Sequence, residues 1–387
     1  MGFSPCKSPM TTCRIVPVAA AFALLVATAL PAIGPPAGWR DRALTFADYE
    51  HMFGALHATA TGYAGSFVSF QFNETTLGIS DYIVMTPSRT TSVFQTIVPQ
   101  VVALGVSSVN GSTFNFTGSA MDISVHNNPT STLMITSKAA IFNETFTLSS
   151  GIDAARNGQS LNLSSPDLTG HLFVTGGATL GLVGTVATAT LPAGTSVIFR
   201  AEATAGEGVA GASGQQQLGD ASVQGLLALE SFAISLEGFI EMSDVEYGGC
   251  IDLGANVTAN GLEINLVSTA PSARFAALHL HESVIHTDNE TSIIVTLDDQ
   301  RVSELSTLDE VLTHSDGGSV FAYIRGVKGL LLLIKLPQQG NHVLKIESSV
   351  STEQQGFNLI QLAAIVAVIL VLLGVAAAVM LRRRPPR

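Results

Sequence analysis

The sequence predicts a mainly β protein, and two kinds of observation support this prediction. Apolar and polar residues alternate with a period of two in short runs, for example at residues 66–72 and 142–148. Turn-forming pairs such as Asn110-Gly111 separate these runs at spacings typical of antiparallel strands. We therefore expect the main body of the chain to be an antiparallel β-sandwich or a β-solenoid.

The same pattern predicts the individual strands of this body. Further strand-like runs lie at residues 113–117, 121–125, 132–136, 170–175 and 178–191. A low-complexity stretch, ATAGEGVAGASGQQQ, then predicts a loop or linker at residues 203–217. Residues 218–230 are compatible with a short helix, and strands resume from Phe232.

A small α+β unit is predicted to begin near Arg274. Ser306-Thr-Leu-Asp309 has the spacing of a capping box, and it opens a predicted helix at residues 306–314. Leu308, Val311 and Leu312 would face the core from this helix. Strands are expected around it at residues 289–297, 320–325, 330–336 and 342–347.

The two ends of the chain have the features of membrane-targeting segments. An apolar run at residues 15–30 follows Lys7 and Arg14, which is the layout of a secretory signal peptide or an N-terminal anchor. Residues 359–381 form a second apolar run that is long enough to cross a bilayer, and RRRPPR follows at once. By the positive-inside rule this basic tail is cytoplasmic, so the body is expected outside the cell membrane.

These features divide the chain into six predicted segments. The first three are a signal peptide (or N-terminal anchor) at residues 1–34, a β-rich extracellular domain at 35–273 and a small membrane-proximal α+β domain at 274–348. A stalk at 349–358, a transmembrane helix at 359–381 and a basic cytoplasmic tail at 382–387 follow.

The charge of the body argues against nucleic-acid binding. The chain has 387 residues, of which 12% are charged, and a net charge of −12. Six of its 18 basic residues lie in the two end segments, which leaves 12 basic and 30 acidic residues between them, a net charge of −18. Phosphate backbones repel such a surface. The expected partners are therefore the membrane, through the C-terminal helix, and surface-layer or other envelope proteins.

The order of these segments resembles the single-pass cell-surface proteins of archaea. The phrases LPAGTSVIFRAE and GNHVLKIES, at residues 191–202 and 340–348, look like edges of the β-rich domains in that group. Gln355-Gly356-Phe357 before the apolar span also resembles the Pro-Gly-Phe signal of archaeosortase substrates, although the proline is missing. We expect the helix to be retained. The resemblance implies a β-rich ectodomain on one membrane anchor.

Seven Asn-x-Ser/Thr sequons agree with an extracellular body, because this motif is the acceptor of N-glycosylation. All of them lie between the two apolar ends, at Asn73, Asn110, Asn115, Asn143, Asn162, Asn256 and Asn289. Cysteine adds little, because only Cys250 lies outside the predicted signal and no intrachain disulfide can form after cleavage.

One group of residues is a candidate metal site. His279 and His281 in LHLHE would project from the same face of a strand, and His286 or Asp288 could add a ligand if the chain turns back. The alternative is a half-buried strand that packs Leu278 and Leu280 into the core and leaves the imidazoles on the wetter face. We favour this alternative, and we expect no functional metal site and no cofactor.

No complete catalytic motif is present, so we expect a surface or envelope protein with a structural, adhesive or ligand-binding role, and not an enzyme. A nucleophile elbow, a P-loop and a dinucleotide-binding glycine motif are all missing. Two other functions stay open. One is an anchored extracellular metal-binding or catalytic domain that uses His279 and His281. The other is a subunit whose span docks with a membrane partner, since Gly374 and Ala378 form a small-xxx-small pair.

Overall fold

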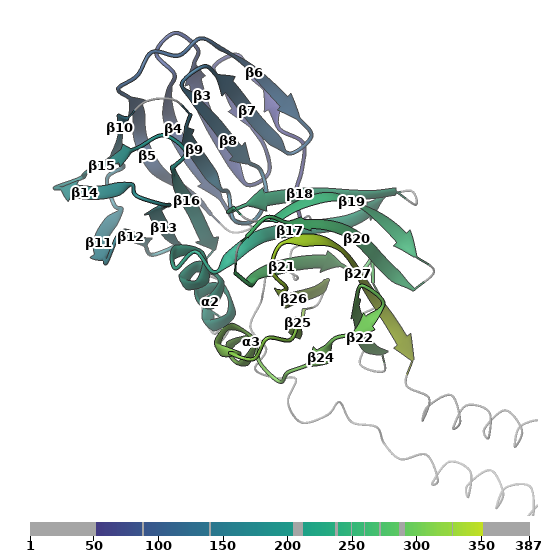
Figure 1. Ribbon diagram of the computed structural model, residues 1–387. Helices are drawn as coiled ribbons and strands as arrows, with labels where there is room; N and C mark the ends of the chain where they lie inside the picture. The colour runs from purple at the N-terminus through teal and green to yellow at the C-terminus, as the bar shows by residue number, and fades with distance from the viewer. Residues whose placement is uncertain are drawn as a thin grey trace, which may run out of the picture. The chain divides into compact units, whose positions relative to one another are not determined.

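The computed structural model describes residues 52–350, except for residues 87–88, 139–140, 204–211, 237–238, 249, 259, 271, 286–290 and 327. The structure is mainly β and contains several antiparallel sheets, as the sequence predicts (Figure 1). Among the described residues, no helix is long and apolar enough to span a membrane. The predicted signal peptide and the predicted span at residues 359–381 lie outside the described residues.

Four sheets are arranged as two pairs, and the first pair, sheets A and B, forms what we call the first β unit. Sheet A contains, in spatial order, β1 (His57–Ala58), β2 (Tyr63–Ala64), β3 (Val68–Asn73), β4 (Gly78–Met85), β5 (Thr90–Pro99), β10 (Phe142–Leu148), β15 (Val186–Leu191) and β14 (Thr179–Val183). Sheet B contains β11 (Asp153–Asn157), β12 (Ser160–Ser165), β13 (Leu168–Val174), β16 (Ser196–Ala203), β9 (Leu133–Ser137), β8 (Met121–His126), β7 (Thr113–Gly118) and β6 (Gly105–Asn110).

Sheets A and B share one hydrophobic core, which is the layered arrangement of a sandwich. Aromatic rings join the layers: Phe94 of β5 lies edge-on to Phe199 of β16, with ring centroids 5.0 Å apart. The alternation in the sequence explains this packing. Along β10, every second residue is buried, beginning with Phe142 and ending with Leu148.

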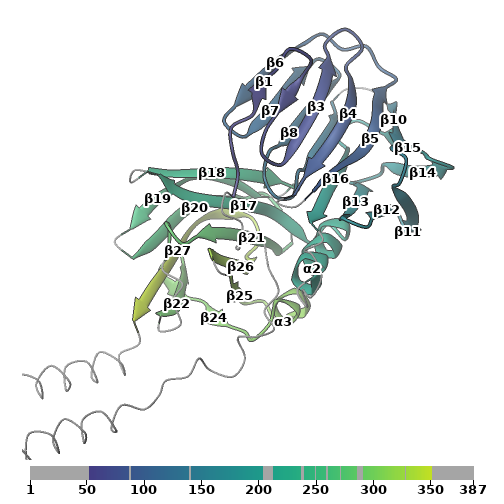
Figure 2. The same ribbon diagram turned by 180° about the vertical axis from the view of Figure 1, so that it is seen from behind.

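Sheets C and D, with two helices, form the second β unit (Figure 2). Sheet C contains β18 (Phe239–Glu246), β17 (Leu227–Leu236), β21 (Arg274–His281), β26 (Gly329–Leu336), β25 (Val320–Arg325) and β24 (Ser303–Glu304). Sheet D contains β19 (Cys250–Thr258), β20 (Gly261–Ser268), β27 (Gly340–Val350), β22 (Thr291–Leu297) and β23 (Gln300–Arg301). The helices are α2 (Ala212–Val223) and α3 (Leu308–Thr313).

Sheet C is covered on both faces, and its sequence shows this. One face packs on sheet D, and the other contacts α2 and α3. Every residue of β26, GLLLLIKL, is therefore buried. A strand with two covered faces has no polar side, so its sequence is a continuous apolar run instead of an alternation.

Helix α3 confirms the predicted short helix, but it spans Leu308–Thr313, whereas the predicted range was residues 306–314. Thr307 is the N-cap, and its hydroxyl accepts a hydrogen bond from the backbone N–H of Glu310 at 3.2 Å. The carboxylate of Glu310 in turn accepts a bond from the backbone of Ser306. The capping box therefore pairs Thr307 with Glu310, and not Ser306 with Asp309. Leu308 and Val311 are buried against sheet C, as predicted.

The strands up to β16 form sheets A and B, and the strands from β17 onward form sheets C and D. Strand β17 pairs with β21, and β20 pairs with β27, so strands before and after residue 274 belong to the same sheets. The helix expected at residues 218–230 is also different. Helix α2 ends at Val223, and β17 begins at Leu227, because the apolar run of β17 is buried between β18 and β21.

Candidate functional site

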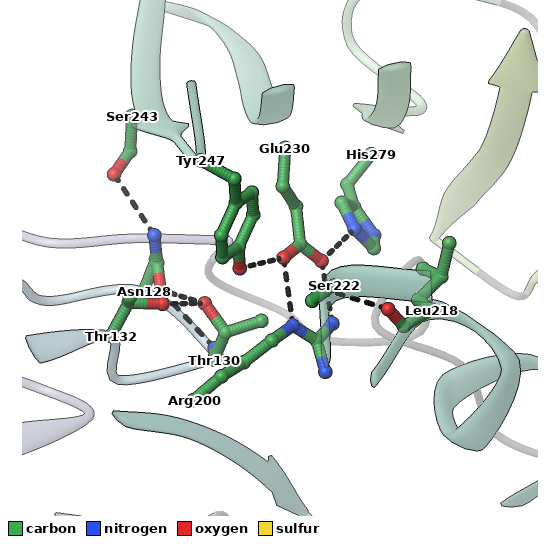
Figure 3. A network of polar contacts seen from close by, with 10 residues as sticks. All are labelled: Asn128, Thr130, Thr132, Arg200, Leu218, Ser222, Glu230, Ser243, Tyr247 and His279. Carbon is green, nitrogen blue, oxygen red and sulfur yellow. Dashed lines mark hydrogen bonds and ion pairs between the residues drawn. The ribbon is translucent and has the colours of Figure 1, made fainter. Parts of the chain in front are cut away.

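A buried polar network lies where the two β units meet (Figure 3). Arg200 of β16 and Glu230 of β17 form a bidentate ion pair: Nε lies 3.0 Å from Oε2, and the second guanidinium nitrogen lies 2.8 Å from Oε1. Both side chains are completely buried. Fork-to-fork pairing of this kind is the strongest form of charge-assisted hydrogen bond between side chains.

Two further side chains bind the same carboxylate (Figure 3). Tyr247, which follows β18, donates its hydroxyl to Oε2 of Glu230 at 2.9 Å. Nε2 of His279, on β21, lies 2.9 Å from Oε1. An ionised carboxylate only accepts hydrogen bonds, so Nε2 of His279 carries the proton. Glu230 thus accepts four hydrogen bonds, two at each oxygen.

Strand alternation places these groups. On β16, Phe199 and Ala201 point into the core of the first β unit, so Arg200 points out of the opposite face of sheet B. On β17, Glu230 and Phe232 point away from sheet D. The ring of His279 stacks on Phe232 with centroids 4.2 Å apart and a 7° angle between planes. The face of sheet B that carries Arg200 and the face of sheet C that carries Glu230 are both buried, because one unit covers the other.

The environment keeps Glu230 ionised and His279 neutral. Burial alone raises the pKa of Glu230, but the charge of Arg200 and the hydrogen bonds from His279 and Arg200 hold it well below its usual range. Burial lowers the pKa of His279, and the hydrogen bond to Glu230 offsets this only in part. Burial, followed by the charge of Glu230, raises the pKa of Tyr247. One cation and one anion therefore remain in the network at neutral pH.

A buried loop of the first β unit extends the contact. Asn128 accepts hydrogen bonds from the backbone and the hydroxyl of Thr130 at 3.1 and 2.7 Å, and its amide nitrogen lies 3.4 Å from Ser243 Oγ on β18. Backbone Ala201 N donates to the carbonyl of Thr130 at 2.7 Å, which fixes the loop on β16. The loop at Asn128-Pro129 is thus part of the contact between the units.

The ion pair and the hydrogen bonds of the network join β16 of sheet B to β17 and β21 of sheet C. Both oxygens of Glu230 are occupied, and Nε2 of His279 donates to one of them. Burial also keeps solvent and substrate away from this carboxylate. The chemistry of the arrangement is therefore that of a joint between two sheets.

Two open pockets flank the network. One has a volume of about 660 Å³ and lies between sheet B and β18, where Asn115, His126, Glu241 and Met242 are among its lining residues. The other, of about 450 Å³, is bordered by Tyr247 of the network and by the half-buried Arg274. Ser243 lines the first pocket and Tyr247 lines the second, so both pockets adjoin the network.

The structure separates the roles of the two predicted histidines. Leu278 and Leu280 are in the core, as expected, but His279 is not on a wetter face: it is buried against Phe232 and bound to Glu230. His281 is the last residue of β21, and its Nδ1 lies 3.0 Å from Ser283 Oγ. Among the described residues, no group of three or more His, Cys, Asp or Glu side chains could hold a metal. His286 and Asp288 lie outside the described residues.

The sequons differ in how open their asparagines are. Asn73, Asn110 and Asn256 are exposed. Asn115 is half-buried beside the larger pocket. The side chains of two others are held within sheets: Asn143 accepts a bond from Thr190 at 2.8 Å, and Asn162 pairs with His171 at 3.1 Å. Asn289 lies outside the described residues. Asn143 and Asn162 lie in strands that have a neighbouring strand on each side, so their side chains can bind residues of the adjacent strands.

Sequence analysis missed Arg200, Glu230 and Tyr247. One signal was present: Glu230 is the only charged residue in LALESFAISL, and an ionisable group inside an apolar strand needs a partner. Nothing in the sequence identifies that partner, because Arg200 lies on a different sheet, 30 residues earlier.

Comparisons with known proteins add little. No protein-family model matches the chain, and no match was found among curated proteins. Among solved structures, the chain is similar to a mutant glycoside hydrolase of family 81 from Clostridium thermocellum, with 10% identity and a TM-score of 0.27. That similarity covers 81% of this chain and 40% of the hydrolase.

Proposed function

We propose that the protein is a membrane-anchored extracellular surface or envelope protein with a structural, adhesive or ligand-binding role. The observation that carries the proposal is the placement of two acid-free apolar segments, at residues 15–30 and 359–381, on either side of an acidic β body. The basic tail after the second segment sets the orientation, with the body outside and the C-terminus in the cytoplasm.

The length of the connecting chain supports a membrane-proximal second β unit. Strand β27 ends at Val350, and the proposed span begins at Leu359. Eight residues separate them and reach at most about 28 Å when fully extended. The second β unit would therefore lie close to the bilayer, and the buried joint would hold the first unit on it.

The joint itself supports a structural role. A surface protein under mechanical or thermal stress must keep its domains together without disulfides. Here the ion pair between Arg200 and Glu230 crosses from β16 to β17 inside the protein. Removal of either partner would leave a buried charge without compensation, so separation of the units is costly.

Protease protection in intact cells tests the topology. With one epitope after Val350 and another after Arg387, external protease should degrade the body and its epitope while the tail epitope stays protected. The same treatment after membrane permeabilisation should remove both and serves as the control. A body that stays protected in intact cells would disprove the proposed orientation.

The alternative, a metal-binding or catalytic domain that uses His279 and His281, has less support, because Nε2 of His279 already binds Glu230. We expect no stoichiometric zinc, copper, nickel or iron in the purified chain. Near-stoichiometric metal that disappears in the double variant His279→Ala/His281→Ala would favour the alternative.

The exposed sequons complete the proposal of a surface glycoprotein. If the host glycosylates this chain after folding, Asn73, Asn110 and Asn256 are the favoured acceptors, since their side chains are open to solvent. Asn143 and Asn162 should be the poorest acceptors, because their side chains already bind neighbouring strands.

A further inference from the structure

The edge of sheet B at β6 differs from the other sheet edges of the described structure. Strand β6 has six residues, GVSSVN, and none is charged. The uncharged region is much longer than the strand: from Thr90 to Met121 the sequence contains no Asp, Glu, Lys, Arg or His. A second long stretch without these residues, from Leu172 to Phe199, contains the edge strand β14.

Apolar side chains are exposed along this edge. The exposed fractions are 89% at Val102, 84% at Leu104 and 73% at Val106. Soluble proteins expose single apolar residues often, but a contiguous exposed group next to a sheet edge is typical of an interaction surface. All residues of β6 except the half-buried Ser107 are exposed.

The backbone of β6 has hydrogen-bonding groups that point outward. The carbonyl of Leu104 accepts a bond from Ser119 N on the β7 side, at 2.9 Å. Backbone groups alternate between the two sides of a strand, so those of Gly105, Ser107 and Val109 face away from β7. Within the described part of the chain, β6 is the last strand of sheet B, and an edge of this kind can pair with another strand.

Other edge strands carry a feature that discourages pairing. Strand β14 is the closest counterpart, since it is also uncharged and Val183 is 83% exposed. There, however, a guanidinium nitrogen of Arg156 donates to the carbonyl of Leu180 at 2.8 Å. Strands β11, β18 and β19 contain charged residues, and β1, β23 and β24 have only two residues each. Charge and short length are the usual protections of an edge.

We propose that β6 pairs with β6 of a second copy of this chain, antiparallel, across a twofold axis. The charge pattern favours a second copy of this chain as the partner of β6. Two acidic copies repel each other over most of their surfaces, and β6 is an edge at which no ionisable side chain of the strand opposes approach. Glu74 lies at this edge, where one of its carboxylate oxygens accepts a hydrogen bond from the hydroxyl of Ser107. Pairing would bury Leu104 and Val106 and extend sheet B through both molecules.

The inference goes beyond the proposed surface role and does not depend on it, because pairing requires only the edge. Membrane anchoring would strengthen pairing by confining copies to one plane, which raises their effective concentration. An edge contact alone buries a small area, so the dimer should be weak and concentration-dependent in solution.

Sedimentation equilibrium of the full chain in detergent tests the proposal, with protein from a host that does not glycosylate, because a glycan at Asn110 would lie on the edge. We expect a monomer–dimer equilibrium for the unaltered chain. Val106→Lys should raise the dimer dissociation constant by about tenfold or more, because like charges would face each other in the paired strands. The matched control Val183→Lys, on the protected edge β14, should leave the constant unchanged.

Cross-linking gives a second measurement that does not depend on Val106→Lys folding correctly. With Cys6→Ser and Cys13→Ser as background, Ser108→Cys should give a covalent dimer with a short bis-maleimide, whereas Val183→Cys should not. Cys250 is buried and should not react. The proposal is overturned if the unaltered chain stays monomeric at all concentrations. It is also overturned if Val106→Lys dimerises as well as the unaltered chain, or if Gly374→Leu in the predicted span alone abolishes the dimer.

Discussion

Two glutamates, one in each β unit, are equally buried and have opposite surroundings. Glu230 accepts hydrogen bonds from Arg200, His279 and Tyr247 at the joint. Glu144, on β10, points into the core of the first β unit, and neither of its carboxyl oxygens has a hydrogen-bond partner in the described structure. Burial by itself raises the pKa of both carboxyl groups. The pKa of Glu144 is therefore well above its ordinary value, whereas the partners of Glu230 bring its pKa below the ordinary value.

The comparison shows that partners, and not depth, decide whether a buried carboxyl group is charged. Burial without a partner favours the protonated form of Glu144, and its unpaired carboxyl group destabilises the core that contains it. Glu230 is an anion. Removal of Glu230 or of its partner destabilises the joint. We therefore expect the two buried glutamates to have opposite effects on stability when they are replaced and when the pH changes.

The largest expected effect follows removal of the cation from the joint. Arg200→Met leaves the charge of Glu230 buried without compensation, which should lower the free energy of unfolding by about 3–5 kcal/mol. The double variant Arg200→Met/Glu230→Leu removes both charges and should recover most of that loss. Urea denaturation followed by circular dichroism measures both. A loss below about 1 kcal/mol in the single variant would show that the pair does not join the units.

A smaller effect is expected when Glu230 loses one partner out of several. Tyr247→Phe deletes a hydrogen bond to a charged group, and we expect a loss of about 1.5–3 kcal/mol in the same denaturation experiment. Tyr63→Phe is the control, since the Tyr63 ring packs on Phe70 in the first β unit and its change leaves the joint intact. Equal losses in both variants would argue against a special role for the Tyr247 hydroxyl.

The replacement of Glu144 should have the opposite sign. Glu144→Met keeps a similar shape and removes a polar group without a partner, so the free energy of unfolding at pH 7 should rise by about 1–3 kcal/mol. Glu304→Met, at an exposed position of β24, is the control and should change stability by less than about 0.5 kcal/mol. A destabilised Glu144→Met chain would contradict the proposed difference between the two carboxyl groups.

The pH dependence gives the same comparison a second test. The folded pKa of Glu144 is raised above its ordinary value of 4.5, so its contribution is most favourable below pH 4.5 and is lost as the pH rises toward the raised pKa. The advantage of Glu144→Met should therefore grow from pH 4.5 upward. Glu230 has a lowered pKa, so its contribution is present above pH 4.5 and is lost as the pH falls below it.

Local patterns in the sequence were sufficient for much of the fold. The alternation at residues 142–148 defines β10, and the predicted run at residues 320–325 matches β25. The N-terminal signal at residues 306–309 predicted α3 to within two residues of its start. These features depend on neighbours along the chain, so propensity and periodicity are enough to identify them. The buried side chains of β10 also follow from the alternation, except that Glu144 occupies one of the inward positions.

The amino-acid sequence by itself determined the acidic charge of the body, its mainly β content, and the apolar ends on which the proposed anchoring rests. Only the tertiary structure decided that β17–β20 belong with β21–β27, that His279 is buried beside Glu230, and that Arg200 is their counter-charge. The physical reason is the range of the interactions. Strand propensity acts over a few residues, whereas the pairing of sheets and the partner of a buried charge depend on residues that only folding brings together.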